Sequence, residues 1–314
     1  MTSDRRPLVS IITPSFNQGR FVRETIASVL WQDYPDLEYL VVDGGSTDGT
    51  LNALRNLGDR VRWISEPDRG QADAINKGWR MARGEILAWL NADDIYRRGA
   101  IARAVAFFEE HPEVDLVYGD CDYIDEEGKT IGKHRARAAS SADILCSPVS
   151  IIAQPATFIR RRVLQTVGYL DESLHCLLDT EYWMRVAAAH RLGYVPTCLA
   201  AFRVHGGSKT GRLAAQFDAE REVVYERFFA APGLPDHLRR LRRKAMSTVY
   251  WRIANTRFLA GDVRQARRYA LAGWKQLPWR LGRTQLKVLA LGLAGPRGPR
   301  LASWVKSLTS AVSS

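Results

Sequence analysis

Four short segments place polar or acidic side chains directly after apolar, strand-like runs. They are residues 13–17 (TPSFN), 42–50 (VDGGSTDGT), 91–94 (NADD) and 178–181 (LDTE). In an open α/β sheet, ligands bind beyond the carboxyl ends of the strands, so we expect these segments to share one pocket. Carboxylates gathered in one pocket repel one another unless a cation or a donor-rich ligand lies among them. A metal-bound diphosphate would supply both.

The adjacent acids Asp93 and Asp94 are candidate metal ligands, because they follow the apolar run 85–90. Carboxylate oxygens bind Mg²⁺ or Mn²⁺ and leave coordination positions open for phosphate oxygens. The alternative is that Asp94 only caps a helix beginning near Arg98, since Asp is a favoured N-cap residue.

Two earlier strand ends offer groups for a nucleotide. Main-chain groups of Thr13 could contact the edge of a base, and the alternative there is a proline-stiffened turn. Asp43 precedes Gly44 and Gly45, so it could accept a hydrogen bond from a base or a ribose, or it could simply cap a helix. The G-x-G-x-x-G and Walker phosphate-loop motifs are missing, which argues against dehydrogenases and P-loop proteins.

Strand-like and helix-like segments alternate from the N-terminus, which predicts βαβ units and a parallel sheet. The predicted strands are residues 8–13, 37–42, 61–65 and 85–90. Further strands at 114–118, 151–159 and 193–203, a hairpin over 123–131 and a helix over 179–190 predict that the sheet becomes mixed. After residue 212 the pattern changes to Arg-rich helical segments.

Basic residues are concentrated in the last third. The net charge is +11, and residues 213–314 hold 19 Lys and Arg against 6 Asp and Glu. This asymmetry indicates anionic lipid or nucleic acid as a partner, or else a solvated helical face. Four tryptophans among these arginines fit either a membrane interface or a helical core: Trp251, Trp274, Trp279 and Trp304.

Other sequence features indicate where the protein acts. The start of the chain does not resemble a signal peptide, and the longest late apolar run, 288–295, is too short for a membrane span of roughly 20 residues. The four cysteines lack metal-binding spacing, so we expect a reduced, cytoplasmic setting.

Six segments in order along residues 7–210 together resemble the family 2 glycosyltransferases of the GT-A fold. They are residues 14–17, 42–50, 66–71, 73–78, 90–94 and 202–205. The GT-A fold is a Rossmann-like mixed α/β sheet flanked by helices. The resemblance implies inverting transfer of one sugar from a nucleotide-diphosphate donor to an acceptor hydroxyl, with Mg²⁺ or Mn²⁺ as cofactor.

The resemblance also implies roles for individual residues. Thr13, Asp43 and Arg69 would hold the nucleotide, and the remaining candidates for donor binding are Pro14, Ser15, Asn17, Asp73, Lys77, Asn91 and Asp93. The implied metal ligands are Asp93, Asp94 and His205. Asn91 stands where many members carry the first aspartate of an Asp-x-Asp motif, so binding of the metal would depend on Asp93 and Asp94.

Asp179 matches the position of the family's general base. Inversion requires an in-line attack by the acceptor hydroxyl, and a carboxylate opposite the leaving diphosphate can accept the proton of that hydroxyl. Glu181 competes for this role, but two residues further along a helix it points roughly 200° away, which favours Asp179. Residues 265–269 (QARRY) nearly match the Gln-x-x-Arg-Trp motif of processive synthases, but they lie in the basic helical region, so we interpret the match as coincidence.

We therefore predict a GT-A domain over residues 1–212, a basic helical appendage over 213–295 and a tail over 296–314. The enzyme would build a cell-surface polysaccharide or a lipid-linked glycan, in the cytoplasm, with peripheral contact to the anionic inner face of the membrane. One alternative is a nucleotidyltransferase, although the expected Gly- and Arg-rich loop after the first strand is missing. The other is a catalytically idle domain beside a basic region that binds nucleic acid or membrane.

Overall fold

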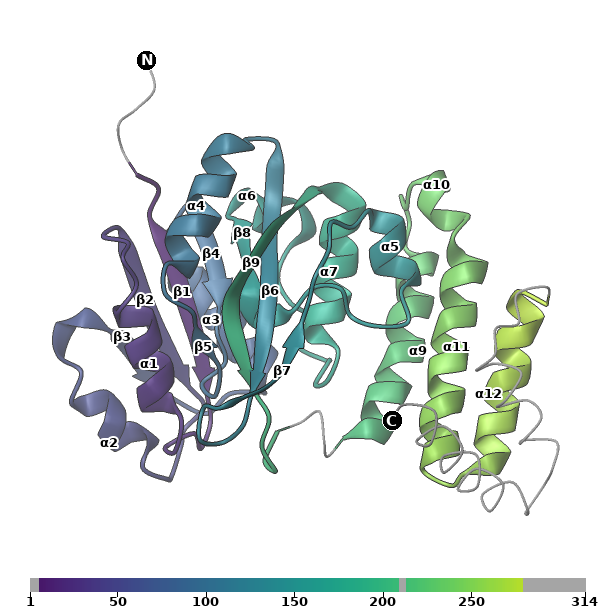
Figure 1. Cartoon of the computed structure of the whole chain (residues 1–314), viewed down its shortest axis with the longest axis horizontal. Coiled ribbons are helices and arrows are strands. Elements are labelled where there is room, and N and C mark those ends of the chain that lie inside the picture. The colour runs from purple at the N-terminus through teal and green to yellow at the C-terminus, as the bar shows by residue number, and fades with distance from the viewer. Residues whose placement is uncertain (1–5, 209–212, 279–314) are drawn as a thin grey trace, which may run out of the picture. The chain divides into compact units, whose positions relative to one another are not determined.

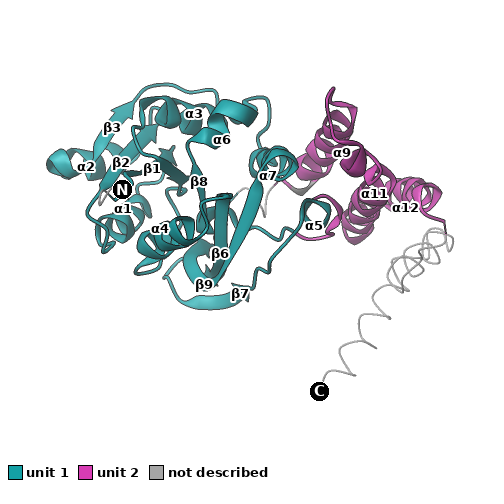
Figure 2. Cartoon of the chain, turned by 90° about the horizontal axis from the view of Figure 1, so that it is seen from above, with its two compact units in different colours: residues 1–144, 150–212 teal, residues 145–149, 213–314 magenta. Residues whose placement is uncertain are grey.

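The computed structural model describes residues 6–208 and 213–278, and the chain forms two compact units (Figure 2). Unit 1 comprises residues 1–144 and 150–212, and unit 2 comprises residues 145–149 and 213–314. The segment 145–149 thus belongs to unit 2, whereas the sequence analysis assigns it to the first domain. The predicted tail over 296–314 lies outside the described residues.

Unit 1 is built on a mixed sheet with the strand order β3-β2-β1-β4-β8-β6-β9-β5, and β7 pairs with β6. The strands are β1 Val9–Ser15, β2 Leu37–Asp43, β3 Arg62–Ser65, β4 Ile86–Trp89, β5 Ile95–Tyr96, β6 Val114–Ile124, β7 Thr130–His134, β8 Thr157–Arg160 and β9 Arg191–Arg203. β8 runs antiparallel to both β4 and β6, whereas β1–β2, β1–β4, β2–β3 and β6–β9 are parallel pairs. The carboxyl ends of β1, β2, β3, β4, β6 and β9 therefore share one edge of the sheet, the lower edge in Figure 1.

Helices cover both faces of this sheet. α1 and α4 lie on one face, and α3 and α6 lie on the other (Figure 2). The helices of this part of the chain are α1 Val22–Leu30, α2 Thr50–Arg55, α3 Gln71–Met81, α4 Ala100–Glu110, α5 Ser141–Cys146, α6 Arg162–Val167 and α7 Leu178–Ala189, with short 3₁₀ turns η1 Gly58–Arg60 and η2 Gln154–Ala156. Because both faces are covered, β1 is buried at every position, as expected for a central parallel strand. Gly78 lets α3 pack closely on β1, since a Cβ there would lie 2.5 Å from Ile12 Cγ2.

Most predicted elements are present, and the differences have local causes. The predicted strand 151–159 is a strand only from Thr157 onward, because Pro155 lacks an N–H and lies in a 3₁₀ turn. β5, α5 and α6 were not predicted, and all three are six residues long or shorter.

The helices described in unit 2 are α9 Ala214–Ala230, α10 Asp236–Arg239, α11 Arg242–Leu259 and α12 Val263–Gln276. α11 and α12 form a helical hairpin whose turn includes Gly261 at a φ of 82°. Asp262 caps α12 by accepting a hydrogen bond from Gln265 N at 3.0 Å. The Ser247 hydroxyl donates to the carbonyl of Gly273 at 3.0 Å, which fixes the rotation of α12 against α11. Throughout the described segments, no helix combines the length and the apolar character needed to cross a bilayer.

Candidate active site

Asp43 ends β2 and is fully buried. Its Oδ2 accepts hydrogen bonds from the N–H groups of Gly45 at 3.1 Å and Ser46 at 2.8 Å. The hydroxyls of Ser46 and Ser65 donate to the same carboxylate at 2.5 and 2.7 Å. Asp43 does not cap a helix, because α2 begins only at Thr50. It ties the loop after β2 to the end of β3, and its contact with a nucleotide stays a prediction.

The loop after β3 lies against this turn. A Cβ at Gly44 would lie 2.4 Å from Asp68 Oδ2, so the close approach of the two loops requires glycine. Asp68 Oδ1 accepts a hydrogen bond from Gly70 N at 2.8 Å. Burial, together with the charges of Asp73 and Asp43, raises the pKa of Asp68. Gly70 has a φ of 118° and precedes α3, a conformation that favours glycine.

The end of β1 contributes Thr13, Pro14 and Ser15, all of them buried. The hydroxyl of Thr13 is hydrogen-bonded to the Tyr39 phenol at 3.0 Å. The Ser15 hydroxyl has no hydrogen-bond partner among the described residues, which fits a group that contacts a ligand. Asn17 adopts a φ of 53°, and its N–H donates to the loop after β2 at 2.7 Å.

Three predicted donor-binding residues meet at the start of α3. Asp73 accepts hydrogen bonds from the Arg69 N–H at 3.0 Å and guanidinium at 3.3 Å, and Lys77 Nζ lies 3.5 Å away. Burial alone would raise the pKa of Asp73, but these hydrogen bonds and the Lys77 charge lower it. Lys77 also pairs with Glu66 at 2.9 Å, and Arg69 with Glu172. Asp73 therefore holds two cations at this edge of the sheet, and the largely exposed Arg69 is the more accessible of them.

Asp94 is fully buried in the loop after β4. Its Oδ1 accepts a hydrogen bond from the Arg203 N–H at 2.9 Å, and its Oδ2 accepts one from Asn91 Nδ2 at 3.0 Å. Burial and the neighbouring charge of Asp93 raise the pKa of Asp94 well above its ordinary value. The capping alternative is excluded, because α4 begins at Ala100, six positions later.

Asn91 connects three parts of the site. Its amide nitrogen donates to Asp94 and also to Gln154 Oε1 at 2.9 Å, and its oxygen accepts a hydrogen bond from Gln71 at 2.7 Å. An aspartate at this position could not donate to Asp94 and would add a like charge beside it. Asn91 thus replaces the first aspartate of the Asp-x-Asp pattern with an amide that can donate a hydrogen bond to Asp94.

His205 follows β9 and meets Asp93, although 112 positions separate them in the sequence. Its Nε2 lies 3.0 Å from Asp93 Oδ2. The N–H of Gly207 donates to His205 Nδ1 at 3.2 Å, so Nε2 carries the proton and donates to Asp93. The imidazole packs on the Phe21 ring at a centroid distance of 4.8 Å, which fixes its orientation.

Arg203 is a residue of this site that the sequence analysis did not select. Its side chain is fully buried, with Nε donating to the carbonyl of Asp93 at 2.9 Å and Nη1 to those of Asp125 and Glu126 at 3.0 and 3.1 Å. Nη2 pairs with Glu24 at 2.5 Å. The sequence signal that points to Arg203 is its position within residues 202–205, one of the six segments that resemble the family.

The residues present fit a divalent cation that takes further ligands from a phosphate group. Within residues 6–208 and 213–278, no three His, Cys, Asp or Glu side chains are grouped to hold a metal. Asp93 and His205 do form a pair, with the Asp94 carboxylate next in the chain. Proteins commonly hold Mg²⁺ through one or two carboxylates and the phosphates of a substrate, so an incomplete protein ligand set is expected here.

An aromatic cluster holds α7 against the sheet. The ring of Trp89 on β4 contacts Trp79 of α3 at 5.5 Å and Trp183 of α7 at 5.2 Å between centroids. Tyr182 of α7 contacts Trp79 at 5.4 Å. These large buried rings hold the second turn of α7 and so position the turn before it, which carries Asp179.

The two candidate bases differ in their surroundings. Glu181 forms a bidentate ion pair with Arg185 at 2.6 and 2.8 Å, and Arg185 also donates to the carbonyls of Val167 and Tyr169. This geometry gives Glu181 a structural role. Asp179 is half-buried, and its Oδ1 accepts a hydrogen bond from the N–H of Thr180 at 2.6 Å. Its role as the base stays a prediction.

Known proteins with similar sequences are glycosyltransferases. The family model for glycosyl transferase family 2 matches residues 10–168. A PGL/p-HBAD biosynthesis glycosyltransferase of Mycobacterium tuberculosis is 33% identical over 208 residues, which are 64% of this chain and 78% of that protein. An uncharacterized glycosyltransferase of Rickettsia felis is 29% identical over 230 residues, but the match spans 38% of its length.

Solved structures with the same fold are more distant in sequence. TarS of S. aureus in complex with UDP-GlcNAc matches with a TM-score of 0.69 and 16% identity, covering 93% of this chain and 89% of that one. The mannosyltransferase PcManGT of Pyrobaculum calidifontis, in complex with GDP-Man and Mn²⁺, matches with a TM-score of 0.65 and 20% identity, covering 98% and 81%. At these identities the likeness shows the fold alone, and it confirms the predicted GT-A fold. With the family model matching half of its length, this chain belongs to glycosyl transferase family 2.

Proposed function

We propose that this glycosyltransferase moves one sugar from a nucleotide-diphosphate donor to an acceptor hydroxyl, with inversion at the anomeric carbon. The observation that carries the proposal is the pair formed by Asp93 and His205, from the ends of β4 and β9. Other strand ends at the same edge supply the unpartnered Ser15 hydroxyl and the turn around Asp43.

The donor is proposed to bind across the ends of β1, β2 and β3. Arg69 and Lys77 each pair with two carboxylates, but Arg69 is 74% exposed and Lys77 only 23%, so Arg69 suits the diphosphate better. The ligands in the neighbouring structures, UDP-GlcNAc and GDP-Man, support a nucleotide-sugar donor. These two ligands differ in both the base and the sugar, so they do not identify the base or the sugar of the donor used by this chain.

Asp93, Asp94 and His205 would hold a divalent cation, Mg²⁺ or Mn²⁺. When bound, it would stabilise the negative charge that develops on the leaving diphosphate. The Mn²⁺ in the PcManGT structure supports this assignment. In the present arrangement the His205 proton lies on Nε2 and is donated to Asp93, so binding a cation through Nε2 would require that proton to move to Nδ1.

Asp179 is the proposed general base. It lies in the first turn of α7, and the second turn of that helix packs on Trp79 and Trp89 through Tyr182 and Trp183. A carboxylate held in this way can accept the proton of the acceptor hydroxyl as the new bond forms. The ion pair with Arg185 leaves Glu181 unsuited to the same task.

We propose an acceptor that belongs to a cell-surface polysaccharide or a lipid-linked glycan. The name of the mycobacterial relative, which refers to PGL/p-HBAD biosynthesis, is compatible with such an acceptor. A peripheral position at the inner face of a membrane stays a prediction. Neither the nucleotidyltransferase nor the catalytically idle alternative gains support from the site.

A panel of nucleotide sugars, assayed for Mn²⁺-dependent thermal stabilisation, tests donor and cation together. We expect one donor to raise the melting temperature of the protein more in the presence of Mn²⁺ than in its absence. Asp93→Asn or His205→Gln should remove most of this additional rise. Asp33→Asn is the matched control, because it removes an exposed carboxylate whose one ion pair among residues 6–208 and 213–278 is with Arg98. Equal stabilisation with and without Mn²⁺ would contradict the cation site, and no stabilisation by any donor would contradict the proposal.

A further inference from the structure

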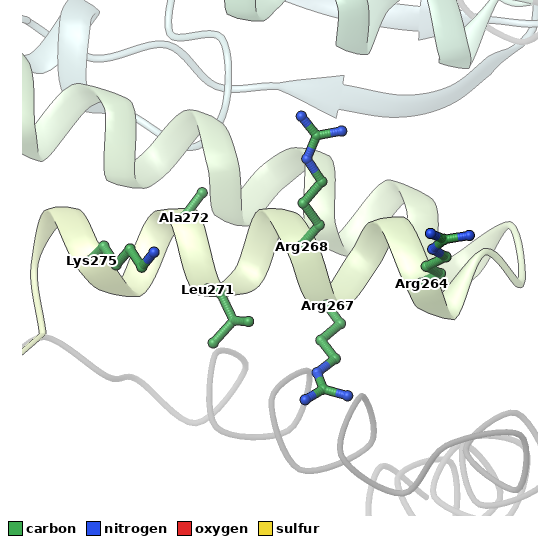
Figure 3. A pocket seen from close by; sticks show the side chains of 6 residues that line it. All are labelled: Arg264, Arg267, Arg268, Leu271, Ala272 and Lys275. Carbon is green, nitrogen blue, oxygen red and sulfur yellow. The ribbon is translucent and has the colours of Figure 1, made fainter.

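The outward face of α12 is a cationic surface on unit 2. Figure 3 shows the six residues of this helix that line a surface pocket: Arg264, Arg267, Arg268, Leu271, Ala272 and Lys275. The cations of this set are all exposed. Positions 264, 268, 271 and 275 follow one another at spacings of three and four residues, so they occupy one face of the helix.

None of these four cations has an acidic partner in the described part of the chain, and no acid lies within α12. The neighbouring helix α11 differs, since Arg242 pairs with Glu226 and Arg257 with Asp218. Cations that are already paired lose that interaction when they bind an anion, whereas those of α12 do not. The face of α12 therefore attracts anions from solution.

The same face carries apolar side chains in contact with water. Leu271 is 39% exposed and Trp274 is 40% exposed. The opposite face is used for packing, because Ala266, Ala270 and Gly273 are buried. The outer face therefore presents a cluster of cations beside two exposed apolar side chains, as expected of a basic helix that contacts anionic headgroups.

We propose that this face of α12 binds an anionic lipid surface. The inference deepens the proposed function and rests on it in one respect, since a lipid-linked acceptor would be presented at such a surface. Nucleic acid would satisfy the cations but provides no acyl layer for Leu271. Trp251, one of the predicted interfacial residues, is instead buried at 9% exposure between α11 and α12. Trp279 and Trp304 lie outside the described residues.

Co-sedimentation of the full chain with vesicles tests the proposal. The vesicles are phosphatidylcholine alone or phosphatidylcholine mixed with phosphatidylglycerol, at low and high salt. One variant replaces Arg264, Arg267, Arg268 and Lys275 with Gln. The control replaces four exposed cations of unit 1 that have no ion pair among the described residues, Arg23, Arg55, Lys133 and Arg191, and it changes the net charge equally.

We expect binding to the mixed vesicles that high salt abolishes. Each basic residue near such a surface contributes about fivefold to partitioning, so the α12 variant, which lacks four of them, should bind about 600-fold more weakly. The control should bind within a few fold of the parent chain. Circular dichroism of both variants excludes unfolding as the cause of a loss.

Three results would overturn the proposal. They are equal binding to neutral and mixed vesicles, equal losses in the two variants, and binding to duplex DNA that exceeds binding to the vesicles. Vesicle binding needs no turnover, so it can fail while sugar transfer succeeds. Transfer to a short water-soluble acceptor, measured in parallel, separates this inference from the proposed function.

Discussion

At the residue scale, Arg203 positions the loop after β4, which carries Asp93 and Asp94. Its fully buried guanidinium holds the carbonyls of Asp93, Asp125 and Glu126, while its N–H holds the Asp94 carboxylate. A buried charge costs free energy unless it is paired and hydrogen-bonded, and here every group of the side chain has a partner. Arg203 is a positioning residue, because it would act on the proposed cation site through Asp93 and Asp94.

Arg203→Met should therefore lower stability and weaken the Mn²⁺-dependent part of donor binding. Each buried carbonyl left without a donor costs about 1–3 kcal/mol, so we expect a loss of about 3 kcal/mol in urea unfolding. Arg20→Met is the control, since both guanidinium groups lie 5.0 Å from the Phe21 ring but Arg20 is 60% exposed. A loss in Arg203→Met as small as that in Arg20→Met would contradict this role.

The base assignment gives a second prediction at this scale. Asp179→Asn should lower kcat by about 10²- to 10⁴-fold, because the proton of the acceptor loses its carboxylate, while the affinity for the donor stays nearly unchanged. Glu181→Gln should lower stability by about 1–3 kcal/mol through loss of its pair with Arg185, with kcat within a few fold. Steady-state kinetics and donor titration separate these effects. Full activity in Asp179→Asn, or the larger loss of kcat in Glu181→Gln, would show that the base is misassigned.

At the scale of elements, the strands are tied together at both edges of the sheet. At the edge opposite the site, Glu38 of β2 accepts hydrogen bonds from Ser10 of β1 at 2.5 Å and from the N–H and guanidinium of Arg83 at 2.7 and 2.8 Å. It also pairs with Arg62 of β3 at 2.8 Å. One carboxylate thus fixes the relative positions of three strands that contribute loops to the site.

This carboxylate predicts a dependence of stability on pH. Burial would raise the pKa of Glu38, but the hydrogen bonds from Ser10 and Arg83 lower it below its ordinary value. Its stabilisation is therefore complete above the unfolded-state pKa of about 4.3 and is lost as the pH falls through the lower folded-state value. Glu38→Gln should cost about 1–3 kcal/mol near neutral pH, and the difference should shrink below about pH 4.

Urea unfolding of both proteins across this pH range measures the effect. Asp59→Asn, an exposed carboxylate without an ion pair in the described chain, should follow the parent protein throughout. A constant difference between Glu38→Gln and the parent from neutral to acidic pH would show that Glu38 does not carry the linkage.

The sequence predicts those parts of the fold whose pattern lies within a few consecutive residues. The end of β2 at Asp43 and the loop holding Asp94 follow from apolar runs that stop at acidic residues. β5 could not be predicted, because its two residues become a strand only by pairing with β9, which lies far away in the sequence. The type of a residue also does not reveal which side chain it contacts in the fold. Arg203 pairs with Glu24, which lies 179 positions away, and Asp93 contacts His205, which lies 112 positions away.

At the scale of the whole molecule, the two units carry different chemistry. The acids of the candidate site belong to unit 1, whereas the basic residues of α12, which have no acidic partner among the described residues, belong to unit 2. We infer that unit 1 binds the donor and performs transfer, and that unit 2 determines where the enzyme meets its acceptor. The α12 variant should therefore keep its turnover with a water-soluble acceptor and lose turnover with an acceptor embedded in anionic vesicles.

The most direct test of the central claim is the identity of the products formed from the donor. We predict that the parent chain, with Mn²⁺ and an acceptor, releases an intact nucleoside diphosphate and forms a glycoside whose anomeric configuration, read by NMR, is opposite to that of the donor. Release of pyrophosphate or a nucleoside monophosphate, retention of configuration, or no cleavage of any donor in the panel would contradict the account.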